Sequence, residues 1–172
     1  MGHDKALLQY HGLPQREYVF ALLQSYCERV FTSCRPGQHI PAELNPLDDM
    51  LAIKGPMNGI LSAFRKHPEC AWLVVAVDMP FVDARAVKAL LAARDGTVPA
   101  VCFRNPENRL PEPLCTVWEP SAYRLLEDFV GRGEVSPRRF LVEYNALCIA
   151  PYDARVILNV NTPEERERLL GQ

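Results

Sequence analysis

Apolar and amphipathic segments alternate along the whole chain. Residues 72–77 (WLVVAV) form the clearest strand candidate, because a continuously apolar run is typical of a strand covered on both faces in a parallel sheet. Segments 17–27, 87–91 and 122–130 carry apolar residues at helical spacing, which predicts helices with one buried face. Strands that alternate with helices predict a three-layer α/β fold with a mostly parallel central sheet.

The remaining elements follow from shorter patterns and from caps. A helix that begins just after Gly59 is predicted at 60–67, and Asp83 is placed to cap the helix at 87–91. Ser136 and Thr162, each followed by proline, are expected to begin two further helices. Additional strands are predicted at 30–34, 98–103, 114–118, 146–150 and 156–160, with a weak one near Met50. In such sheets ligands bind beyond the carboxyl ends of the strands, so the residues just after each strand are candidates for chemistry.

Composition places the chain among ordinary globular proteins. It has 172 residues, 48% of them hydrophobic and 23% charged, and a formal net charge of −2. This length suits a single domain with a sizeable core. A basic face for nucleic acid is not indicated, no apolar run approaches the roughly 20 residues that span a bilayer, and the first residues do not resemble a secretory signal.

The six cysteines are scattered singly, without a CxxC pair, and the four histidines show no metal-ligand spacing. Several cysteines lie in apolar runs, where a free thiol behaves as a small hydrophobe. We therefore expect reduced, structural cysteines and a cytoplasmic location.

Asp78 directly follows the apolar run, in VVAVDMPF. A carboxylate at the end of a buried strand is suited to hold Mg²⁺, which takes oxygen ligands and bridges substrate phosphates. The alternative is that Asp78 only caps a turn before Pro80. The residues alone leave both interpretations open.

Three further segments could contact a ligand, and each has a plain structural alternative. Gly55 and Gly59 precede a helix and would let the backbone approach a ligand, although Gly-Pro and Asn-Gly are also ordinary turns. Asn159 and Asn161 share one side of an extended segment and offer donors and acceptors, unless Asn161 helps to cap the last helix. Lys5 could pair with triphosphate oxygens or lie on the surface.

Together, in this order and spacing, four motifs resemble the nucleotidyltransferase family that contains molybdenum cofactor guanylyltransferase. MGHDKALL matches the end of the family's opening loop, LAGGxSxRMGxDKxLL. GPMNGIL is similar to the family's GPLxGIL segment, VVAVDMPFV to the strand with the metal-binding aspartate, and LNVNTPEE to the (F/L)NxNTPED ending. The resemblance covers nearly the whole chain and implies one nucleotidyltransferase domain with a Rossmann-like fold, residues 1–172, incomplete at its amino end.

The resemblance implies that GTP and molybdopterin react to give the guanine dinucleotide form of the cofactor and pyrophosphate. Gly2 and Lys5 would bind the nucleotide phosphates, with Lys5 offsetting charge as pyrophosphate leaves. Gly55 and Gly59 would lie against the base. Asp78 would bind Mg²⁺. Such chemistry needs positioning and charge neutralisation rather than a protein nucleophile.

The resemblance further implies that Asn159 and Asn161 help to hold the acceptor. It also implies contact with a molybdoenzyme or its chaperone, because the product is a labile cofactor. The chain departs from the family at Arg109-Leu110-Pro111-Glu112-Pro113-Leu114, where the family meets the acceptor. Arg104 and Arg109 could contact an anionic acceptor there, but surface positions are the expectation.

A second departure concerns the amino end. Met1 aligns with the methionine of RMG, so the family's first strand, its LAGG turn and the following arginine are absent. That strand is central in the family's sheet, and its loss would expose ladder groups and apolar faces on both neighbours. We expect this chain to be poorly active by itself or to borrow a strand from elsewhere.

Other functions stay open at this point. A cytidylyltransferase or a sugar-phosphate nucleotidyltransferase would share the fold, and a small residue at Gly59 mildly favours a purine. A non-catalytic nucleotide-binding domain is an alternative of a different class. A redox or metal-storage protein is disfavoured because the cysteines show no paired spacing.

Overall fold

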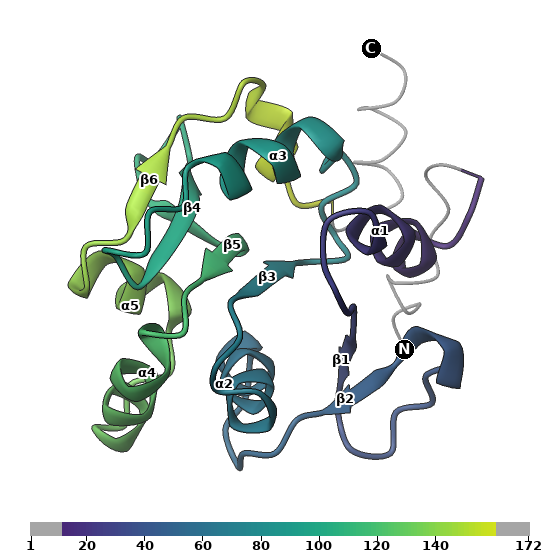
Figure 1. Ribbon diagram of the computed structural model, residues 1–172, viewed down its shortest axis with the longest axis horizontal. Helices are drawn as coiled ribbons and strands as arrows, with labels where there is room; N and C mark the ends of the chain where they lie inside the picture. Colours follow the sequence, from purple (N-terminus) through teal and green to yellow (C-terminus); the bar gives the residue numbers. More distant parts are fainter. Residues whose placement is uncertain (1–11, 161–172) are drawn as a thin grey trace.

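The computed structural model describes residues 12–160 (Figure 1). Its α-helices are α1 (Gln15–Gln24), α2 (Pro56–Lys66), α3 (Ala84–Ala92), α4 (Ala122–Gly131) and α5 (Pro137–Glu143). Its strands are β1 (Thr32–Cys34), β2 (Pro46–Asp48), β3 (Trp72–Val75), β4 (Ala100–Arg104), β5 (Pro111–Trp118) and β6 (Leu147–Ile149). Short 3-10 helices cover Ala42–Leu44 and Ala154–Ile157.

The described strands form two separate sheets. β1 and β2 pair in parallel, and the larger sheet has the order β3-β5-β4-β6. In the larger sheet β5 runs antiparallel to β3 and β4, whereas β6 runs parallel to β4. The α/β fold is as predicted, but the described pairing is mixed rather than mostly parallel.

A short connection explains this difference. Residues 105–110 are all that joins β4 to β5, and the Asn105 N–H donates to the Leu110 C=O at 2.8 Å. Arg109 takes a left-handed conformation in this turn, with φ 63°. Parallel neighbours need a crossover of about a dozen residues or more, so a turn of this length can only join antiparallel strands. The sequence predicted both strands but not their hairpin.

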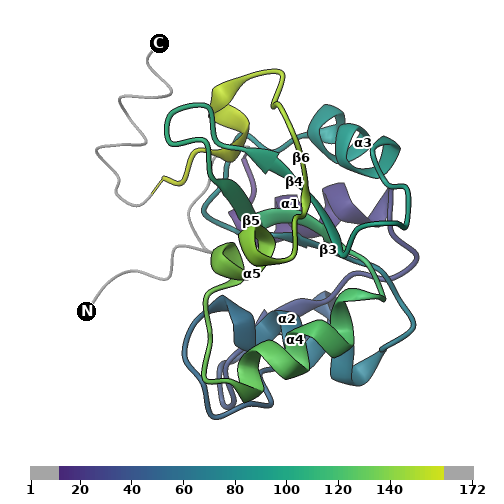
Figure 2. The same ribbon diagram turned by 90° about the vertical axis from the view of Figure 1, so that its left-hand side faces the viewer.

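Helices cover both faces of the larger sheet, in agreement with the predicted layers (Figure 2). One buried cluster joins α1 and α3 to side chains of β4 and β5, among them Val101 and Val117. The other joins α2, α4 and α5 to the opposite face, where Trp118 and Phe140 are fully buried. Apolar positions at helical spacing therefore face the sheet, as the sequence pattern required.

Three predicted elements differ from the structure. Residues 156–160 are not a strand, because Asp153 caps a 3-10 helix there by accepting from the Arg155 N–H at 2.9 Å. The second strand lies at Pro46–Asp48 rather than near Met50. Helix α2 begins at Pro56, so Gly59 lies inside its first turn rather than before it.

Two predicted caps are confirmed. The Asp83 carboxylate accepts from the Ala86 N–H at 2.9 Å, and the Ser136 hydroxyl accepts from the Arg139 N–H at 3.3 Å. Each side chain satisfies a backbone donor that the first helical turn leaves without a partner.

The six cysteines are all free thiols in this structure. Burial raises the pKa of the Cys115 thiol to about 12. The Sγ atoms of Cys102 and Cys148 lie 3.5 Å apart on neighbouring strands. Within residues 12–160, no group of three or more His, Cys, Asp or Glu side chains is arranged to hold a metal ion, and no helix is long and apolar enough to cross a membrane.

Candidate active site

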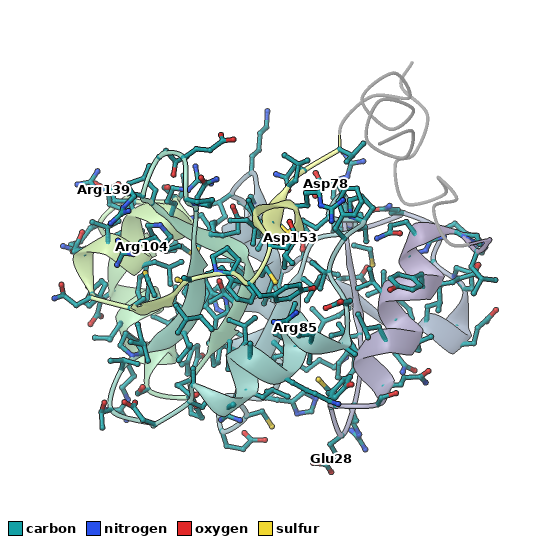
Figure 3. All side chains as sticks on the ribbon, turned by 90° about the horizontal axis from the view of Figure 1, so that it is seen from above. Glu28, Asp78, Arg85, Arg104, Arg139 and Asp153 are labelled. Carbon is teal, nitrogen blue, oxygen red and sulfur yellow. The ribbon has the colours of Figure 1, made fainter. Side chains whose placement is uncertain are left out.

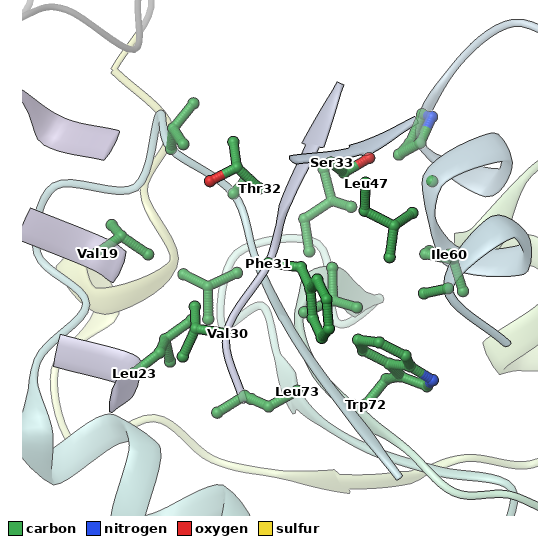
Figure 4. Close-up of a pocket in the computed structure, with 18 of the residues that line it drawn as sticks. Val19, Leu23, Val30, Phe31, Thr32, Ser33, Leu47, Ile60, Trp72 and Leu73 are labelled. Atoms are coloured by element: carbon green, nitrogen blue, oxygen red, sulfur yellow. The ribbon is translucent and has the colours of Figure 1, made fainter. Parts of the chain in front are cut away.

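A cavity of about 540 Å³ lies between the two sheets. The chain around β1 lines one side, β3 and the residues after it line the other, and α1 and α2 flank the space (Figure 4). Val30, Phe31, Trp72 and Leu73 contribute to an apolar part. Polar side chains line the rest of the cavity: Arg16, Thr32, Ser33, Arg35, Asp49 and Asp78.

Asp78 lies just beyond the carboxyl end of β3, as the sequence predicted. Its backbone is held in place because the Val160 N–H donates to the Asp78 C=O at 2.8 Å. Its Oδ1 atom is buried and has no hydrogen-bond partner among the described residues. A buried carboxylate oxygen without a donor is costly, and a cation or a ligand donor would relieve that cost.

Gly55 enters the cavity lining at the amino end of α2. Its φ of 95° lies in the left-handed region, where glycine is favoured. Asn58, which is 5% exposed, fixes the loop that leads to Gly55. Its Oδ1 accepts from the Leu51 N–H at 3.0 Å, and its Nδ2 donates to the C=O groups of Leu51 and Ile53 at 2.8 and 2.9 Å. Gly55-Pro56 thus forms the start of α2 in the cavity wall, and Asn58-Gly59 lies within this helix rather than in a turn.

Gly59 allows a close approach between α2 and the end of β1. A Cβ at this position would overlap the Ser33 Oγ and lie 3.4 Å from the Asp49 Oδ1. The Ser33 hydroxyl donates to the same Asp49 oxygen at 3.2 Å. Burial raises the pKa of the Asp49 carboxyl, while the Ser33 hydrogen bond and the Arg35 charge oppose that rise. This places a half-buried carboxylate in the cavity wall beside Gly59.

The sequence did not single out Asp49. It lies in residues 38–54, which the sequence predicted mostly as loop. The one signal that could have found it is that two adjacent aspartates, Asp48 and Asp49, stand shortly before the Lys54-Gly55-Pro56 segment. Its pairing with Ser33 spans 16 residues of sequence and depends on the β1–β2 register.

Arg16 was also missed, because it directly precedes the helix predicted at 17–27 and has no motif around it. Its side chain lines the cavity from the first turn of α1 and is only 8% exposed. The Nε atom is buried and has no hydrogen-bond partner among the described residues. The neighbouring Gln15, fully buried, donates to the Met79 C=O at 3.5 Å and so joins α1 to the residue after Asp78.

Glu112 is a second carboxylate within electrostatic reach of Asp78. Burial raises the pKa of the Glu112 carboxyl; the Leu114 N–H and the Arg138 guanidinium lower it, and the charge of Asp78 raises it further. The Arg138 Nη2 lies 3.4 Å from the Glu112 Oε2, and its Nε donates to the Pro111 C=O at 3.1 Å. The carboxylate of the Leu-Pro-Glu-Pro-Leu segment is therefore paired with the Arg138 guanidinium.

Arg104 and Arg109 do not join this site. Both are exposed, and the Arg104 Nη1 donates to the Arg109 C=O at 3.0 Å within the β4–β5 turn. Figure 3 shows Arg104 well apart from Asp78. The expectation that they are surface charges agrees with this placement.

Asn159 is exposed and directly precedes Val160, whose N–H binds the Asp78 backbone. The structure therefore brings its segment to the end of β3. Gly2, Lys5 and Asn161 lie outside the described residues, as does the helix expected after Thr162. The roles of all seven predicted site residues stay predictions.

The fold and the cavity define a class of protein: an α/β domain with a cavity at the carboxyl end of β3, the kind of position where α/β sheets bind ligands. The sequence profile of the MobA-like NTP transferase domain matches residues 1–147. A molybdenum cofactor guanylyltransferase from Pseudomonas paraeruginosa is 31% identical over 171 residues, which cover 95% of this chain and 84% of that protein. The chain belongs to the family of MobA-like NTP transferase domains, and its class of enzyme is nucleotidyltransferase.

A molybdenum cofactor biosynthesis bifunctional protein from Synechocystis is 36% identical over 168 residues, which cover 96% of this chain but 48% of that protein. The chain thus spans about half the length of this relative. Molybdopterin-guanine dinucleotide biosynthesis protein A from Archaeoglobus fulgidus superposes with a TM-score of 0.73 at 24% identity, covering 97% of this chain and 89% of that one. The 2-C-methyl-D-erythritol 4-phosphate cytidylyltransferase of Thermus thermophilus gives 0.72 at 16% identity, covering 99% and 95%. At these identities the superpositions show the fold alone.

Proposed function

We propose that the chain transfers GMP from GTP to a molybdopterin-type acceptor with release of pyrophosphate. The observation that carries the proposal is the buried, unpartnered Oδ1 of Asp78 in a cavity that Gly55 and Gly59 also line. Family membership supplies the reaction class, and relatives named molybdenum cofactor guanylyltransferase support the choice of substrates. The acceptor phosphate attacks the α-phosphorus directly, so the site acts by positioning and by neutralising charge.

Asp78 fits the Mg²⁺ ion that such a transfer commonly uses. Carboxylate oxygens are preferred Mg²⁺ ligands, and the buried Oδ1 lacks any other partner among the described residues. When bound, Mg²⁺ would neutralise phosphate charge. Glu112, which pairs with Arg138, would make the electrostatic potential at Asp78 more negative, but it would not itself bind the Mg²⁺ ion.

Base selection would fall to Asp49 and Ser33. Guanine carries N–H donors on its Watson–Crick edge, and a carboxylate is an acceptor that matches them. A base without such N–H donors would leave the half-buried Asp49 carboxylate without a partner, and it would therefore bind more weakly than guanine. Gly59 keeps this wall free of a side chain.

Positive charge for the phosphates would come from Arg16, which lines the cavity with an unpartnered Nε, and from Lys5 with the Gly2 backbone in the opening loop. Asn159 and Asn161 would hold the acceptor. Delivery of the product would involve contact with a molybdoenzyme or its chaperone. A cytoplasmic location suits the free thiols.

The test is thermal stabilisation of the chain by GTP, CTP, ATP and UTP, each with and without Mg²⁺, because a ligand of the native state raises the midpoint with occupancy. We expect a Mg²⁺-dependent shift with GTP. Asp78→Asn should remove the Mg²⁺ dependence, whereas Asp128→Asn, at an exposed position on α4, should not. Pyrophosphate release from GTP with molybdopterin then measures the transfer.

Selectivity provides a second comparison. Asp49→Asn should reduce the preference for GTP over CTP by about fivefold or more, since one lost acceptor contact is worth roughly 1–3 kcal/mol. A CTP preference in the unaltered chain would assign it instead to cytidylyl transfer. Binding without pyrophosphate release would indicate a nucleotide-binding domain that is not catalytic.

A further inference from the structure

The segment that follows β6, residues 150–160, packs against the loop that follows Asp78. Val156 of its 3-10 helix belongs to the same buried cluster as Met79, the residue after Asp78. At the end of the segment, the Val160 N–H donates to the Asp78 C=O at 2.8 Å. These contacts place residues 150–160 directly against the backbone that carries the Asp78 carboxylate.

Tyr152 joins the beginning of this segment to the start of α3. The Arg85 Cζ lies 4.0 Å from the centre of the Tyr152 ring, well within the range in which a guanidinium and an aromatic face attract each other. Burial, together with a hydrogen bond to Asp83 and the charge of that carboxylate, raises the pKa of the Tyr152 phenol to about 12. The phenol therefore stays protonated near neutral pH and donates to the aspartate that caps α3.

Arg155 makes a second contact between the two segments. Its Cζ lies 5.8 Å from the centre of the Phe81 ring. Asp153 holds the guanidinium in place, because its Oδ2 accepts from the Arg155 Nη2 at 2.7 Å and from the Nε at 3.0 Å. Phe81 lies between Asp78 and Asp83 in sequence, so both arginine–aromatic contacts act on the stretch that leads away from Asp78.

The position of the Asp78 carboxylate depends on these contacts. Within residues 12–160 its Oδ1 has no hydrogen-bond partner, so no bond to that oxygen fixes where it points. Its place is set instead by the backbone, which the Val160 N–H holds. Asn159 directly precedes Val160, so the same bond sets the separation of two predicted site residues. A displacement of about 1 Å can slow an enzyme about 100-fold, even when its cause lies far from the chemistry.

We propose that Tyr152 is a positioning residue for the transfer: its contacts with the start of α3 hold residues 150–160 so that Asp78 and Asn159 keep a fixed separation. Tyr152 is 39% exposed and does not line the cavity, so it acts through the backbone and not on a substrate. The inference rests on the proposed function, because it takes Asp78 as the residue that binds Mg²⁺.

The test compares Tyr152→Leu with Tyr152→Phe in the full chain. Leucine removes both the hydroxyl and the ring beside Arg85, whereas phenylalanine keeps the ring. Leucine should raise the Mg²⁺ concentration that gives half-maximal stabilisation by GTP about tenfold, and phenylalanine should raise it about threefold or less. Amide exchange at Val160, measured without metal or nucleotide, should become about tenfold faster with leucine.

Tyr144→Leu is the matched control, because it also removes a ring and a hydroxyl that contact neighbours. The Tyr144 ring centre lies 4.5 Å from that of Phe140, and the Tyr144 hydroxyl accepts from the Arg132 Nη2 at 3.1 Å, at the end of α5. Both leucine variants should lower Tm. Only Tyr152→Leu should change the Mg²⁺ requirement and the exchange at Val160.

Two results would overturn the positioning role. Unchanged exchange at Val160 in Tyr152→Leu would mean that Tyr152 does not hold the Asp78 backbone. A lower Tm with an unchanged Mg²⁺ requirement would mean that Tyr152 supports only the fold. If no form of the chain responds to Mg²⁺ but Val160 still exchanges faster in Tyr152→Leu, Tyr152 does hold the Asp78 backbone, and the metal role proposed for Asp78 is the part that fails.

Discussion

Replacing Gly59 by alanine tests the closest contact in the cavity wall. In a helix interior this substitution normally stabilises by about 1 kcal/mol, because alanine loses less backbone entropy on folding. Here the new Cβ would overlap the Ser33 Oγ. Ser33 can escape only by rotating, which breaks its 3.2 Å hydrogen bond to Asp49.

The magnitude follows from these two effects. Overpacking costs about 1–3 kcal/mol, and loss of the hydrogen bond costs roughly 1 kcal/mol. Set against the helix gain, Gly59→Ala should lower the free energy of unfolding by about 1–3 kcal/mol. In a Ser33→Ala background the nearest atoms are at 3.4 Å, an ordinary contact, so the same change should instead stabilise by about 0.5–1 kcal/mol.

Urea unfolding of the four chains in this double-mutant cycle measures the coupling. Gly131→Ala is the matched control, because Gly131 lies in α4 with nothing within 4 Å of an added Cβ. It should stabilise slightly in both backgrounds. If Gly59→Ala stabilises equally with and without the Ser33 hydroxyl, the contact between α2 and β1 does not exist as described.

Three further outcomes are expected. Burial raises the pKa of the Glu112 carboxyl in the folded chain, so ionisation of this carboxyl destabilises the fold as the pH rises. Glu112→Gln should therefore raise Tm at about pH 8. The difference should vanish near pH 4, below the ordinary glutamate pKa. A Tm that is unchanged at about pH 8 would contradict this. Asn58→Ala should lower the free energy of unfolding by about 2–4 kcal/mol in urea, because three partly buried backbone groups of Leu51 and Ile53 lose their partner. Iodoacetamide followed by mass spectrometry should label exposed Cys70 well before Cys115, whose pKa of about 12 keeps it protonated; equal labelling in the native chain would refute the burial.

Local periodicity decided the elements of this protein. The apolar run at 72–77 predicted β3, and the caps at Asp83 and Ser136 predicted the starts of α3 and α5. These features depend on neighbours a few residues apart, so the sequence contains the whole cause. The position of Asp78 just beyond β3 followed from the same pattern.

Tertiary structure decided which strands pair and which side chains meet. The direction of β5 depends on the hairpin at 105–110, and the 3-10 helix at Ala154–Ile157 displaced a strand that the apolar residues alone favoured. Asp49 and Arg16 line the cavity, and the charge of Glu112 acts on Asp78, through contacts between distant segments that no local pattern encodes. The cavity between β1 and β3 likewise exists only because two strands far apart in sequence face each other without pairing, since hydrogen-bond partners in a sheet are fixed by topology rather than by neighbouring residues.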